Sequence, residues 1–112
     1  MMATISSAAN IAASGLAAAD TELAVSANNV ANANTDGFSA ASVSAEEQPG
    51  GGVKVSISVE ALQEANAPSN TDLAHEVVSQ LLSIAAYRSN LKTLKTADAQ
   101  AQALLEAVSP KS

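Results

Sequence analysis

Residues 26–38 read SANNVANANTDGF, and this stretch decides where the first long helix of the chain must stop. It combines four asparagines with a Thr-Asp-Gly turn and the only phenylalanine of the protein, at Asn28, Asn29, Asn32, Asn34, Thr35, Gly37 and Phe38. Asparagine is a poor helix former because its side-chain amide competes for nearby backbone groups. The stretch nevertheless closes a segment that has a helical pattern. We therefore expect a helix terminus, a recognition surface, or both at these residues.

The segment before this stretch is rich in alanine and has an apolar repeat with alternating steps of four and three residues. The repeat predicts a long amphipathic helix over about residues 4–34, with a narrow contact stripe. Gly15 lies inside this helix, where glycine costs about 1 kcal/mol relative to alanine. Gly15 is either a tolerated weak position or the place where another helix approaches closely over Ser14 and Gly15. The repeat positions are Ile5, Ala9, Ala12, Leu16, Ala19, Leu23, Ser26 and Val30, of which only Ser26 is polar.

A second and stronger repeat fills the C-terminal part of the chain. The sequence Ser-Asn-Thr-Asp at residues 69–72 predicts a helix start, with Asp72 and Glu76 near the positive end of the helix dipole. The repeat predicts a helix over about residues 72–107, which Pro110 prevents from continuing. Nine of its eleven positions are apolar, and the two exceptions are Gln80 and Asp98. The positions are Leu73, Val77, Gln80, Ile84, Tyr87, Leu91, Leu94, Asp98, Ala101, Leu105 and Val108.

Residues 39–68 have a different character. The run Gln-Pro-Gly-Gly-Gly at residues 48–52 predicts a turn, and strict alternation of apolar and polar residues from Val53 to Glu60 predicts a strand. A weaker strand near residues 41–47 would complete a hairpin. We therefore predict one domain of residues 1–112 that is mainly α. Two long antiparallel terminal helices, coiled-coil-like, are joined by a small β-hairpin and loops.

Composition limits the core and the partners. The chain has 112 residues and is 47% hydrophobic, but 26 of those hydrophobic residues are alanine, which buries little area. A thin seam is therefore easier to build than a thick core, and neighbours would help to cover it. The net charge of −6 argues against nucleic acid or an anionic membrane as the main partner. We also expect no membrane insertion, since no apolar run is long enough, and no cleaved signal peptide.

The sequence offers no pattern that is typical of catalysis. His75 is the only histidine, and no second ligand stands at helical spacing from it, so we predict no metal site. The chain has no cysteine, and its serines lack a nucleophile-elbow pattern. Its glycine run is followed by neither the lysine nor the serine or threonine of a phosphate loop at the required spacing. We predict that the protein is not an enzyme and has no catalytic residue or cofactor.

Three basic residues of the predicted C-terminal helix share one face, and we call them the basic stripe: Arg88, Lys92 and Lys95. Their spacing of four and three residues makes them neighbours on the helix surface. The N-terminal helix carries only acids, Asp20 and Glu22. Two interpretations stay open: a charge match between the helices or between subunits, and a stripe that is merely solvated.

Two stretches resemble the flagellar basal-body rod and hook proteins, the axial components of the bacterial flagellum. The first is SGLAAADTELAVSANNVANANTDGF at residues 14–38. The second, at residues 70–98, contains NTDLAHEVV and then AYRSNLKTLKTAD. The chain departs from the family at Ile84 and Ala85, where relatives often have Gln-Arg. The residues that match motif positions are Asn28, Asn29, Asn32, Asn34, Thr35, Gly37, Tyr87, Asn90 and Asp98, and Phe38 closes the first motif.

The resemblance implies a structural role. Family members leave the cell unprocessed through the flagellar export apparatus and stack helically through their terminal helices, so the residues above would serve packing and assembly. It implies a structural axial subunit of the flagellar basal body, in the periplasm-spanning rod. The expected partners are copies of the chain, other rod or hook subunits and the export apparatus. The alternative is a helical-hairpin interaction or adaptor protein outside the rod, derived from the same fold.

Overall fold

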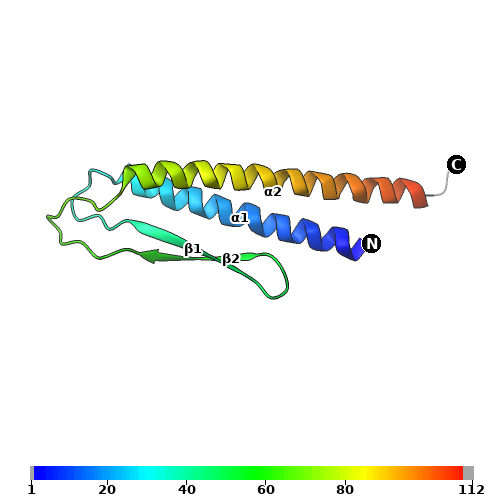
Figure 1. The fold of residues 1–112 in the computed structure, drawn as a ribbon, viewed down its shortest axis with the longest axis horizontal. Coiled ribbons are helices and arrows are strands. Elements are labelled where there is room, and N and C mark those ends of the chain that lie inside the picture. The colour runs from blue at the N-terminus through cyan, green and yellow to red at the C-terminus, as the bar shows by residue number, and fades with distance from the viewer. Residues whose placement is uncertain (1, 110–112) are drawn as a thin grey trace.

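The computed structural model describes residues 2–109 and is mainly helical, as predicted (Figure 1). Helix α1 (Met2–Ala31) is followed by strand β1 (Ala41–Glu47), strand β2 (Val53–Val59) and helix α2 (Leu73–Val108). The two helices run in opposite directions side by side, and the hairpin lies along α1 (Figure 1). The molecule is elongated, with extents of 73 × 24 × 19 Å.

Helix α2 begins where its sequence signal lies. The carboxylate of Asp72 caps the helix by accepting a hydrogen bond of 3.1 Å from the backbone N–H of His75. At the other end, Ser109 folds back, and both its backbone N–H and its hydroxyl donate to the carbonyl of Leu105, at 2.9 and 2.7 Å. These caps satisfy backbone groups that a helix terminus leaves free. Both observed bounds lie one residue later in the sequence than the predicted 72–107.

Helix α1 ends at Ala31, three residues before the predicted end at Asn34. The amide of Asn32 donates to the backbone carbonyl of Asn28 at 2.9 Å. The backbone beyond it tightens, since Ala33 donates to Val30 at 3.1 Å and Thr35 donates to Asn32 at 3.0 Å. Each of these backbone bonds spans three residues instead of four, as at many helix ends. The side-chain amide of Asn32 thus adds to the backbone hydrogen bond that closes the last turn of α1.

The hairpin has the predicted strands, paired antiparallel from Ala41 opposite Val59 to Glu47 opposite Val53. In its turn, Gly51 and Gly52 both have positive φ, and the backbone of Gln48 bonds to both of them. The hydroxyl of Ser14 on α1 accepts a 3.0 Å hydrogen bond from the backbone N–H of Val53. Within the described residues the hairpin packs on α1 and not on α2. A two-stranded sheet needs such support to be stable.

The predicted contact stripe of α1 is largely the observed one. Ala12 and Ala19 are buried, and the polar Ser26 is buried with them. The exception is Val30, which is 38% exposed, while its neighbour Asn29 is only 1% exposed. All buried apolar side chains of the described part of the chain are alanines: Ala12, Ala18, Ala19, Ala40 and Ala97.

The predicted contact stripe of α2 is wrong at most of its positions. Leu73 and Val77 are more than half exposed, and so is Leu105, whereas Glu76, Ser83 and Ala97 are the buried residues of this helix. The spacing of helices depends on the side chains at their contact. Because α1 offers alanine, serine and Gly15, the close approach selects small and hydrogen-bonding residues of α2. Several large aliphatic side chains of α2 are therefore left exposed, while Leu91 and Leu94 are half-buried.

Candidate functional site

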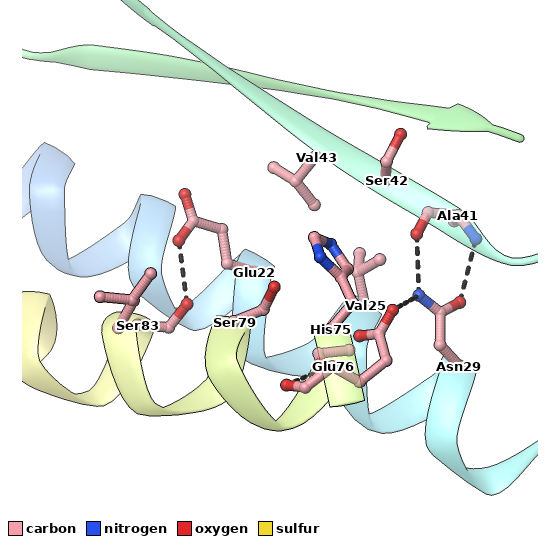
Figure 2. Close-up of a pocket in the computed structure, with 12 residues that line it drawn as sticks. Glu22, Val25, Asn29, Ala41, Ser42, Val43, His75, Glu76, Ser79 and Ser83 are labelled. Atoms are coloured by element: carbon pink, nitrogen blue, oxygen red, sulfur yellow. Dashed lines mark hydrogen bonds between the residues drawn. The ribbon is translucent and has the colours of Figure 1, made fainter. Parts of the chain in front are cut away.

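Asn29 is the residue around which α1, β1 and α2 meet (Figure 2). Its amide oxygen accepts from the backbone N–H of Ala41 at 2.9 Å, and its nitrogen donates to the carbonyl of the same residue at 2.8 Å. The same nitrogen donates to Oε1 of Glu76 at 2.9 Å. The hydroxyl of Thr71 in turn donates to the backbone carbonyl of Asn29 at 3.1 Å. One buried amide therefore fixes the hairpin and the start of α2 against α1.

Two of the polar residues that interrupt the sequence repeats contact each other. Ser26 is the break in the α1 repeat and Gln80 is the first of the two breaks in the α2 repeat, and Nε2 of Gln80 donates to the hydroxyl of Ser26 at 3.1 Å. That hydroxyl donates to the backbone carbonyl of Glu76 at 3.3 Å. Every buried side-chain nitrogen and oxygen of the described residues has a partner. We call this contact between α1 and α2, formed by Ser26, Glu76 and Gln80, the polar seam. Because its groups are paired, it avoids the cost of unpaired buried polar groups.

A groove of about 280 Å³ lies beside this cluster, between β1 and the two helices. Its apolar lining includes Val43 and Leu82, and the ring of His75 points toward Val43 (Figure 2). Glu22 is engaged at its wall, because its Oε2 accepts from the hydroxyl of Ser83 at 2.9 Å. Within residues 2–109 no three His, Asp or Glu side chains converge as metal ligands would. The arrangement joins secondary-structure elements through polar contacts.

Gly15 is the point of closest approach between the helices. A Cβ atom at this position would lie 2.5–2.6 Å from the three terminal atoms of the Asn90 side chain. Asn90 is held there by a 2.8 Å hydrogen bond from its Nδ2 to the carbonyl of Ala86. Of the two interpretations of Gly15, the structure favours close approach of a helix.

The turn after α1 needs its glycine. Gly37 has a φ of +78°, and its backbone N–H donates to Ala67 at 2.7 Å. A Cβ atom on it would lie 2.9 Å from the carbonyl oxygen of Ala65. Left-handed backbone and lack of space both favour glycine. Beside it, Thr35 donates to the amide oxygen of Asn32 at 3.1 Å, and Phe38 is half-buried.

The remaining residues named from the sequence are spread along the molecule. Asn28 and Asn34 are exposed at the end of α1. Tyr87 is 38% exposed, and the exposed Asp98 accepts from Gln102 one turn later at 3.3 Å. The structure thus joins Asn29 to the start of α2 and Asn90 to Gly15, but it forms no single site from the whole set. The basic stripe is exposed on α2: Arg88, Lys92 and Lys95.

Sequence reasoning missed the main partner of Asn29. Glu76 was expected near the helix dipole, but it is 6% exposed and part of the buried seam. Asn70 also escaped notice, although its Oδ1 accepts from the backbone N–H of Ala40 at 2.7 Å. The one available signal was the pair of repeat breaks at Ser26 and Gln80, since buried polar groups need partners.

Residues 9–38 match the family model described as flagella basal body rod protein. No curated protein matches the chain. The matched segment contains most of α1, including Asn29, and the turn that Gly37 makes possible. Within residues 2–109 no helix combines the length and the apolar character that crossing a membrane requires. The match confirms, over this segment, the resemblance to the flagellar basal body rod family that the sequence showed.

Proposed function

We propose that the chain is a structural axial subunit of the bacterial flagellar basal body, assembling helically through its terminal helices in the periplasm-spanning rod. Its partners in this proposal are copies of itself, other rod or hook subunits, and the flagellar export apparatus, which delivers it without signal-peptide cleavage. The observation that carries the proposal is the family match over residues 9–38.

The packing of the helices supports an assembly role. The seam between α1 and α2 buries alanines and small polar side chains, whereas large aliphatic residues of α2 are exposed. Soluble monomers rarely leave large apolar patches uncovered, and such patches mark interaction surfaces. A subunit that gains most of its apolar burial from neighbours would have this distribution.

The residues taken over from the resemblance have two roles in this proposal. Asn29, Gly37 and Asn90 give the subunit its shape, because they fix the hairpin, the turn and the distance between the helices. The others are offered to neighbouring subunits or shape the end of α1: Asn28, Asn32, Asn34, Thr35, Phe38, Tyr87 and Asp98.

The basic stripe gives a test of assembly in the purified protein. Changing Arg88, Lys92 and Lys95 together to glutamate should weaken self-association at low ionic strength, and salt should reduce the difference because it screens exposed charges. Sedimentation velocity measures the effect. Lys54→Glu on the exposed hairpin is the control and should leave association unchanged. Equal association of all variants at low salt would mean that the stripe is only solvated.

The decisive experiment is deletion of the gene, followed by motility assays and imaging of basal bodies. We expect loss of motility and rods that stop before completion, with both restored by the complete chain. Normal filaments and normal motility in the deletion strain would contradict the rod assignment. That result would favour the alternative of an adaptor protein outside the rod.

A further inference from the structure

Helix α2 has a row of large apolar side chains that the rest of the described chain leaves exposed. We call it the aliphatic row: Leu73, Val77, Leu81 and Ile84, which are 52%, 55%, 63% and 38% exposed. At 100° per residue, these positions lie roughly a quarter turn around α2 from the seam residues Glu76 and Ser83. The basic stripe continues the row toward the C-terminus, turned about 30° further around the helix. This face of α2 is therefore aliphatic near the start of the helix and positively charged further toward the C-terminus.

Helix α1 has an unpartnered face of the opposite kind. We call it the alanine face: Ala13, Ala17, Asp20, Ala24 and Ala27, all exposed. Its positions follow steps of four and three residues, away from those that contact α2 or the hairpin. Alanine side chains allow another helix to approach closely, as they do in the seam within the subunit. Asp20 is the only charged residue of this face.

We infer that the alanine face of one copy of this chain packs against the aliphatic row and basic stripe of a second copy. The inference rests on the proposed function and names the surfaces through which copies meet. Large side chains of α2 fit against small ones of α1, and Asp20 meets the positive charge of the basic stripe. Pairing of two aliphatic rows would leave Asp20 and the alanine face uncovered. Size and charge together therefore favour the unlike pair.

Disulfide cross-linking between copies tests this contact, and the chain has no cysteine of its own to interfere. If Asp20 lies beside Lys92, Ile84 lies eight residues away, opposite residue 28 in an antiparallel contact or residue 12 in a parallel one. We therefore pair Ile84→Cys in one chain with Ala27→Cys or Ala13→Cys in another, each residue being the nearest member of the alanine face. Under mild oxidation, a mixed dimer should form with one of the two partners.

Controls separate this contact from others. Ser44→Cys on the exposed hairpin should give no mixed dimer with Ile84→Cys. Asp20→Lys should lower the yield of mixed dimer roughly two- to fivefold at low salt, since an exposed ion pair contributes up to about 1 kcal/mol. Lys92→Asp in the other chain, the one that carries Ile84→Cys, should restore the yield of mixed dimer with the Asp20→Lys chain. Circular dichroism of each variant confirms that the helices are intact.

Three results would overturn the inference. One is a dimer of Leu81→Cys or Ile84→Cys alone, without mixed dimers, which would show that aliphatic rows pair with each other. The second is equal cross-linking to the hairpin control. The third is absence of self-association in sedimentation. None of these decides the proposed function, which stands or falls on the phenotype of the deletion strain.

Discussion

Replacing Gly15 by alanine tests the closest contact between the two helices. The added methyl group would lie 2.5–2.6 Å from the end of the Asn90 side chain, whereas carbon contacts are normally about 3.5–4.0 Å. Either Asn90 leaves its place and its hydrogen bond to Ala86, or the helices separate by about 1 Å. Both responses disturb the alanine seam.

The expected magnitude combines two opposing terms. Overpacking costs about 1–3 kcal/mol, and the better helix propensity of alanine offsets about 1 kcal/mol of this. We therefore expect Gly15→Ala to lower the free energy of unfolding by about 0–2 kcal/mol. In an Asn90→Ala background the side chain that would clash with the new methyl group is absent. There, Gly15→Ala should raise the free energy of unfolding by about 1 kcal/mol. The coupling between the two sites is then about 1–3 kcal/mol.

Urea unfolding of the four proteins of this cycle, followed by far-ultraviolet circular dichroism, measures the coupling. Ala13→Gly is the matched control on the exposed face of α1. It should cost about 1 kcal/mol whether residue 90 is asparagine or alanine. A coupling between Gly15 and Asn90 below about 0.5 kcal/mol, the usual error of additivity, would refute the contact.

Three further substitutions test the other fixed points by the same unfolding measurement. Asn29→Ala removes the amide that bonds to the buried Glu76 carboxylate and to the β1 backbone, and it should lower the free energy of unfolding by roughly 2–4 kcal/mol. The control Asn28→Ala, at an exposed position, should lower it by less than about 0.5 kcal/mol. Similar losses for both variants would contradict the role of Asn29. Gly37→Ala should cost about 1–2 kcal/mol from left-handed backbone alone, against little for Gly50→Ala, which has open space around it. Asp72→Ala removes the cap of α2 and should cost about 1 kcal/mol; no loss would mean that water caps this helix equally well.

The local part of the fold could be predicted because it depends on neighbours in sequence. Caps, turn glycines and strand alternation act over a few residues, so the start at Asp72 and both strands were predicted within a residue. The end of α1 was misplaced at Asn34, since several asparagines could each have stopped the helix. Which amide bonds to the backbone first depends on the geometry of the last turn, where Asn32 reaches Asn28.

The α2 face that contacts α1 could not be predicted from hydrophobicity. The periodic signal finds the row with the largest aliphatic side chains, and it assumes that the partner in the same chain covers that row. Here the partner of α2 is α1, an alanine-rich helix with a glycine at the point of closest approach. Such a helix packs more tightly against small residues than against leucine and valine. The apolar pattern therefore could not predict the contact of Asn90 with Gly15 or that of Glu76 with Asn29.

The breaks at Ser26 and Gln80 show what such a count leaves out. A polar residue in an apolar repeat usually costs stability, but it fixes register when only one alignment gives it a partner. Their 3.1 Å hydrogen bond is formed in one alignment of α1 and α2. The polar seam thus sets how the helices meet within a subunit, while the aliphatic row stays free for contacts with another copy. In this chain, one face of α2 sets the register with α1 and another carries the large apolar side chains. Only the apolar face produces a strong periodic pattern in the sequence.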